Sequence, residues 1–69
     1  DISIQTPNRT GIVIELKYAE DGNMEKACAE ALKQIEEKKY AEGLKRRGVK
    51  KIIRYGIAFW EKECMVVMA

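Results

Sequence analysis

Two charged residues, two positions apart, end an apolar run near the start of the chain. Glu15 and Lys17 close the run that begins at Gly11, where β-branched residues preceded by Pro7 and Asn8 indicate a strand. Side chains alternate along a strand, so Glu15 and Lys17 share one face. Burying an unpaired carboxylate or ammonium is costly, and the pair therefore marks a place where chemistry could occur.

A third charged residue, Asp1, is predicted to lie on the same face. Residues 1–5 alternate polar and apolar, as a half-buried strand does, and residues 6–10 contain turn formers, so the next strand should return antiparallel. The apolar residues of both strands must share one face, because a slip of one residue would turn one set into water. That face consists of Ile2, Ile4, Ile12, Ile14 and Leu16. Asp1 then falls beside Glu15 and Lys17 on the opposite face.

Two carboxylates and a backbone carbonyl are hard oxygen ligands of the kind that Mg²⁺ or Mn²⁺ prefers. Asp1, Glu15 and the carbonyl of Leu16 could supply three such ligands and leave positions for water and a phosphate. Lys17 would place a compact cation beside the attacking water or the scissile phosphate. The alternative is a solvated ion pair between Glu15 and Lys17 on an exposed face, since Glu-x-Lys is common on strands.

The composition predicts one small domain and excludes several kinds of catalytic site. The 69 residues are 46% hydrophobic and 35% charged, with a formal net charge of +2. The absence of histidine excludes a Ser-His or Cys-His dyad and an ordinary zinc site. Cys28 and Cys64 are too few for a disulfide scaffold; a bridge between them is the alternative, and a reducing, cytoplasmic compartment fits better. No apolar run has the length of a membrane span.

Hydrophobic periodicity and turn residues predict an α/β fold. The expected elements are strands over residues 1–5, 11–17, 51–59 and 64–68, a helix from 24 to at least 36, and a short helix over 40–47. Residues 21–23 offer a helix N-cap, Gly48 should stop the short helix, and Gly56 suggests a bulge or close packing. The order β-β-α-(α)-β-β gives a mixed four-stranded sheet with helix on one face and a right-handed parallel crossover.

A basic cluster and one tryptophan complete the candidate residues. The cluster consists of Lys45, Arg46, Arg47, Lys50 and Lys51. It could bind DNA phosphates or be a solvated helix end, and the acidic residues that balance the total charge favour the solvated end. Trp60, in an expected polar turn over 60–63, is interpreted as a hairpin-end core or interface residue, with base stacking as the alternative.

The order of these features resembles the PD-(D/E)XK nuclease superfamily: an Asp, a turn, a hydrophobic strand ending Glu-x-Lys, then a helix carrying a Gln. Residues 11–64 are similar to the C-terminal nuclease-like domain of bacterial proteins with an AAA-ATPase-like N-terminal region, most specifically over 31–45 and 50–59. The resemblance implies a restriction-endonuclease-like core that hydrolyses nucleic-acid phosphodiesters, DNA being favoured, with Mg²⁺ or Mn²⁺.

Carried over residue by residue, the resemblance makes Asp1 and Glu15 metal ligands, Lys17 the catalytic lysine and Gln34 the helix Gln beside the active site. Gln34 shares the sheet-facing stripe of the helix, although a Gln at the edge of that stripe is the alternative. Some branches place Tyr four residues after the Gln, where this chain has Lys38.

The superfamily's first core helix and first strand have no counterpart here, so residues 1–69 are expected to be a single truncated domain of a longer, ATPase-linked chain. The uncovered sheet face then predicts self-association. A non-catalytic interaction module that keeps the nuclease fold is the alternative function.

Overall fold

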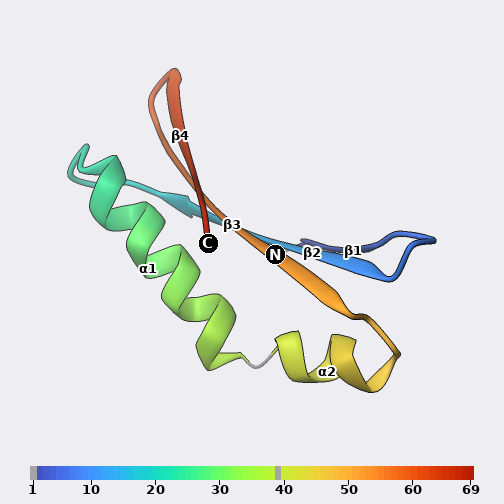
Figure 1. Cartoon of the computed structure of the whole chain (residues 1–69). Coiled ribbons are helices and arrows are strands. Elements are labelled where there is room, and N and C mark those ends of the chain that lie inside the picture. Colours follow the sequence, from blue (N-terminus) through green and yellow to red (C-terminus); the bar gives the residue numbers. More distant parts are fainter. Residues whose placement is uncertain (1, 39) are drawn as a thin grey trace.

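The computed structural model describes residues 2–38 and 40–69, and Asp1 lies outside this range (Figure 1). The elements are β1 (Ile2–Gln5), β2 (Thr10–Tyr18), α1 (Met24–Glu37), α2 (Tyr40–Arg46), β3 (Lys51–Trp60) and β4 (Glu63–Met68). The strands form one sheet in the order β1-β2-β3-β4. Only β2 and β3 are parallel, which the intervening helices make possible, so the expected mixed α/β sheet is confirmed.

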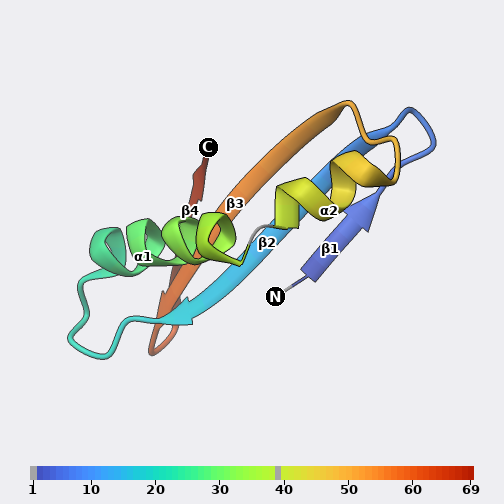
Figure 2. The same cartoon turned by 90° about the horizontal axis from the view of Figure 1, so that it is seen from below.

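The β1–β2 register matches the prediction from the hydrophobic pattern. Ile2 pairs with Ile14 and Ile4 with Ile12, so these four isoleucines share one face of the sheet. Both helices lie against the other face, which carries Val13, as Figures 1 and 2 show. The sheet therefore has one covered and one open face.

Two groups of buried side chains join the helices to the sheet. One contains Val13, Ile35, Leu44 and Val49; the other contains Ala19, Ala27, Cys28 and Ala58. The second group is built of small residues, which allow the helix backbone to approach the strands closely. Cys28 and Cys64 are both free, and the buried Cys28 thiol donates to the Met65 carbonyl at 3.4 Å.

Gly56 marks a close approach of α1 to the sheet. A Cβ atom at this position would lie 2.6 Å from the backbone carbonyl oxygen of Cys28, nearer than real contacts allow. The pairing of β3 with β2 and β4 continues through Gly56 without an extra residue. Close packing, one of the two roles predicted for this glycine, is therefore confirmed, and a bulge is excluded.

The ends of both helices follow the predicted signals, while the β3–β4 turn is shorter than expected. Asn23 caps α1 by accepting from the Lys26 N–H at 3.1 Å, and Gly48 follows α2 with φ of +87°. The expected polar turn over 60–63 is wrong at both ends, because Trp60 belongs to β3 and Glu63 to β4. Trp60 packs on the group of small residues that contains Ala19, Ala27, Cys28 and Ala58, as its core interpretation predicts.

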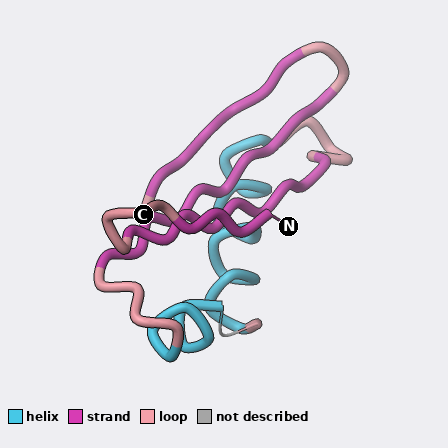
Figure 3. The backbone as a smooth tube through the Cα atoms, turned by 90° about the vertical axis from the view of Figure 1, so that its right-hand side faces the viewer, coloured by secondary structure: helices cyan, strands magenta, loops and turns pink. Residues whose placement is uncertain are grey.

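The open face of the sheet is apolar. Its exposed large side chains are Ile2, Ile4, Leu16, Tyr18, Phe59, Val66 and Met68. Tyr18 and Phe59 are register partners whose rings meet edge to face, with centroids 5.6 Å apart. Figure 3 shows the twist of this sheet and the β3–β4 hairpin extending beyond its neighbours. Neither described helix is long and apolar enough to cross a membrane.

Candidate active site

Glu15 is buried on the covered face of the sheet. Its residue is 5% exposed, and it is the one buried charged side chain among the residues that the structure describes. Its Oε1 atom accepts a hydrogen bond from the ammonium of Lys38, 3.2 Å away. Lys38 directly follows the last residue of α1. The Lys38 side chain is 48% exposed, so the pair joins a buried carboxylate to a half-exposed cation.

The second carboxylate oxygen of Glu15 is also buried. Within residues 2–38 and 40–69, no hydrogen-bond partner of Oε2 is present. A buried charged oxygen without a partner is costly, by about 1–3 kcal/mol or more. Oε2 of Glu15 is therefore available to accept a hydrogen bond or to bind a cation.

Backbone direction adds a second oxygen beside Glu15. The Thr10 carbonyl accepts from the Thr6 N–H, towards β1, whereas the Ala19 N–H donates to the Phe59 carbonyl on β3. Because these directions alternate along a strand, the even-numbered Leu16 directs its carbonyl towards the β1 side. One carboxylate oxygen and one carbonyl oxygen are ligands that suit Mg²⁺ or Mn²⁺, so this donor set fits a divalent cation.

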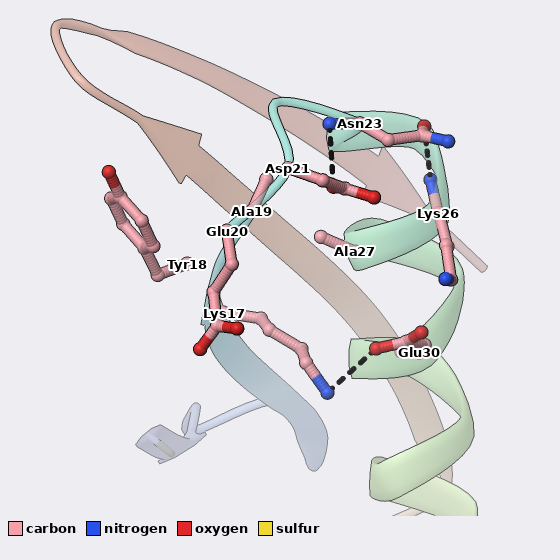
Figure 4. Close-up of a pocket in the computed structure, with 9 residues that line it drawn as sticks. All are labelled: Lys17, Tyr18, Ala19, Glu20, Asp21, Asn23, Lys26, Ala27 and Glu30. Carbon is pink, nitrogen blue, oxygen red and sulfur yellow. Dashed lines mark hydrogen bonds and ion pairs between the residues drawn. The ribbon is translucent and has the colours of Figure 1, made fainter.

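Lys17 forms the second ion pair between β2 and α1. Its ammonium lies 2.8 Å from a Glu30 carboxylate oxygen, drawn as a dashed line in Figure 4. The hydrogen bond from Lys17 and then its charge hold the pKa of the Glu30 carboxyl below its ordinary value of 4.5. Both side chains are partly exposed, at 31% and 42%, so a solvent-borne group can reach the ammonium.

Helix α1 brings its two charged partners to β2 in one row. Glu30, Gln34 and Lys38 are spaced by four residues and therefore lie along one side of the helix. Glu30 contacts Lys17 and Lys38 contacts Glu15, which leaves Gln34 one helical turn from each ion pair. Gln34 is half-buried, which suits both the sheet-facing stripe and the edge of that stripe, so its role stays a prediction.

A pocket of about 460 Å³ opens where β2 ends and α1 begins (Figure 4). It is lined by Lys17, Tyr18, Ala19, Glu20, Asp21, Asn23, Lys26, Ala27 and Glu30. Two lysines and three carboxylates thus border one opening. The Lys17 ammonium faces this space, and the pocket gives a phosphate or a water molecule access to it.

The structure places some of the predicted site residues together and separates others. Glu15 and Lys17 pair with Lys38 and Glu30, which lie with Gln34 along one side of α1 and its C-cap, while the basic cluster is exposed at the α2 end. The alternative of a solvated Glu15–Lys17 ion pair is wrong, because each side chain pairs with α1 instead. Asp1 lies outside the described residues, and within them no group of three or more His, Cys, Asp or Glu could hold a metal ion.

The sequence interpretation missed Lys38 and Glu30 as partners of the strand residues. A signal for Lys38 was present, since Ala31, Ile35 and Lys38 continue one helical stripe that is buried at its first two members. Glu30 carried no comparable signal, because it is a charged residue beside that stripe.

The family model described as the PD-(D/E)XK nuclease superfamily matches residues 1–69. No curated protein and no solved structure matches the chain.

Proposed function

The chain belongs to the PD-(D/E)XK nuclease superfamily, and from this premise we propose that it hydrolyses nucleic-acid phosphodiester bonds with a divalent cation. The observation that carries the proposal is the buried Oε2 atom of Glu15, which has no partner among the described residues. An apolar residue would fill this position on the covered face at lower cost, so the carboxylate is kept for a ligand.

Glu15 and the Leu16 carbonyl would hold Mg²⁺ or Mn²⁺, with Asp1, outside the described residues, as the third protein ligand. Such a cation lowers the pKa of bound water and offsets the charge that builds up on phosphate oxygens. Glu15 keeps its position because Lys38 holds its other oxygen.

Lys17 binds the scissile phosphate or the attacking water. Its present partner, Glu30, is 42% exposed, and solvent screens a partly exposed ion pair of this kind so that it adds little stability. An incoming phosphate can therefore replace Glu30 at low cost. Gln34, between the two ion pairs, orients the substrate or a water molecule.

Finer features of the proposal rest on the resemblance in sequence. We expect DNA as the substrate, an ATPase-like domain in the same parent chain, and a cytoplasmic location consistent with two free cysteines.

We also propose that the open apolar face pairs with a second copy of the chain. Seven large apolar side chains, each more than a third exposed, form one face of the sheet, and patches of this kind mark interaction sites. Sedimentation at increasing concentration should show a dimer that Leu16→Lys dissociates. A strictly monomeric wild-type chain would contradict this.

The direct test is cleavage of DNA and RNA with Mg²⁺ or Mn²⁺, compared with EDTA. We expect Glu15→Gln and Lys17→Met to lower the cleavage rate by at least about 100-fold, because each removes a group that stabilises the transition state. Glu63→Gln and Lys62→Met make the same charge changes at the exposed end of the β3–β4 hairpin and should leave the rate unchanged. Cleavage that survives both site variants would overturn the assignment, and binding without cleavage would favour the interaction module.

A further inference from the structure

Six exposed cations gather at the end of the sheet opposite the pocket. We call this group the basic end; it consists of Arg9, Lys45, Arg46, Arg47, Lys50 and Lys51. Arg9 is in the β1–β2 turn and was not part of the cluster predicted from the sequence. The Lys50 N–H donates to the Arg9 carbonyl at 2.9 Å, which fixes this turn to the segment before β3. Figure 1 shows the β1–β2 turn and α2 together at this end, far from the β2–α1 loop.

The basic end is free to meet a partner from solution. All six residues are exposed, and none forms an ion pair with another described residue. By contrast, Lys17, Lys33 and Lys38 each contact a carboxylate of the chain.

The charges of the chain are separated along its length. Residues 2–14 and 43–60 contain seven Lys or Arg and no Asp or Glu, which gives +7. The rest of the chain contains six Lys or Arg and all eleven Asp and Glu, which gives −5, so the net charge is +2. Glu42, in the first turn of α2, adjoins the second segment, but within the described residues no ion pair joins it to the basic end. The acidic residues thus balance the total charge without pairing with the basic end, and this weakens the reason for treating the cluster as an ordinary solvated helix end.

We infer that the basic end binds the phosphate backbone of double-stranded nucleic acid at a fixed distance from the bond that is cut, an inference that rests on the proposed function. Thr10 pairs with Lys51 at this end, and Lys17 lies seven residues further along β2. At about 3.3 Å per residue the two positions are about 23 Å apart. With 3.4 Å per base pair, this spans about seven base pairs. A duplex that reaches the basic end must therefore extend at least that far from the scissile phosphate.

Duplex DNA binding without cleavage, in EDTA, tests the basic end separately from catalysis. Arg47→Gln/Lys50→Gln should weaken binding and reduce the slope of log affinity against log salt by about 1.8, for two lost phosphate contacts. The control Lys33→Gln/Lys62→Gln also lowers the net charge by two, but outside the basic end, and should keep the wild-type slope. Equal slopes for the two double variants would overturn the inference, whatever the cleavage assay shows.

Duplex length provides the second measurement. Wild-type affinity should fall when the duplex is shortened below about seven base pairs, and Arg47→Gln/Lys50→Gln should remove this dependence. Anionic phosphatidylserine vesicles serve as the competing partner. If the variant loses vesicle binding while its duplex affinity stays at the wild-type value, the basic end is a membrane surface and the inference is wrong.

Discussion

The two ends of the sheet differ in what their charged residues contact. At the end where β2 meets α1, Glu15 and Lys17 are both held by side chains of the helix. At the basic end, the cations of α2 and the β1–β2 turn are exposed and form no ion pair within the described chain. Helix α1 lies close enough to the strands to reach their charges, whereas α2 contributes one buried leucine, Leu44, and presents its basic residues to solvent.

This difference separates charged side chains that are held in place by ion pairs within the chain from exposed charged side chains that can bind a partner. The ion pairs at the β2–α1 contact fix side chains in a partly buried environment, where position determines chemistry. The exposed cations at the basic end make no ion pair with the described residues and so add little to the stability of the fold. They can instead attract polyanions over a long range. Variants at the β2–α1 contact should therefore change stability and cleavage, whereas variants at the basic end should change the binding of polyanions.

Gly56→Ala is expected to give the largest loss of stability, because its Cβ would meet the Cys28 carbonyl oxygen at 2.6 Å. Overpacking against a backbone atom should lower the free energy of unfolding by about 1–3 kcal/mol. The matched control is Gly43→Ala in α2, where nothing lies within 4 Å of the new methyl group. It should raise stability by up to about 1 kcal/mol, since alanine favours helix. Equal effects in urea unfolding would refute the difference in packing between α1 and α2.

Lys38→Met should be the next largest change, because it leaves the buried Glu15 carboxylate without its cation. We expect the free energy of unfolding to fall by about 1–3 kcal/mol. Glu15→Met should be neutral or stabilising, since it removes a buried charge and leaves Lys38 half-exposed to water. Urea unfolding without divalent cations checks both variants. A greater loss for Glu15→Met than for Lys38→Met would show that the carboxylate serves the fold rather than a ligand.

Glu30→Gln should give the smallest effect and a distinctive pH dependence. Because Lys17 lowers the pKa of folded Glu30, the ion pair adds stability above about pH 4.5, and this is lost as the pH falls through the lowered folded value. The difference in unfolding free energy between wild type and variant should thus be constant near neutral pH and shrink in acid. A difference that does not change down to pH 3 would contradict this role of Lys17.

Much of the fold could be predicted because local signals and the hydrophobic pattern agree. The isoleucines of β1 and β2 determined the register, Gly48 and the 21–23 cluster bounded the helices, and the crossover required β2 and β3 to be parallel. The differences lie at the ends of elements, as at Trp60, which continues β3 and packs on the buried small residues.

The site was less accessible to such reasoning, because its geometry depends on tertiary contacts. The spacing of Glu15 and Lys17 placed them on one face, but their partners lie 23 and 13 residues away along the chain. Nor could spacing show that Arg9 joins the basic cluster, since this follows from the backbone hydrogen bond between Arg9 and Lys50.

The most direct test of the account is where a paramagnetic cation binds. Mn²⁺ titrated into the ¹⁵N-labelled chain should first broaden the backbone amide signals around Glu15 and Leu16, and Glu15→Gln should abolish this broadening while Glu63→Gln leaves it intact. Broadening that persists at these amides in Glu15→Gln, or that appears first at the exposed acidic residues Glu36 and Glu37, would contradict a cation site on β2.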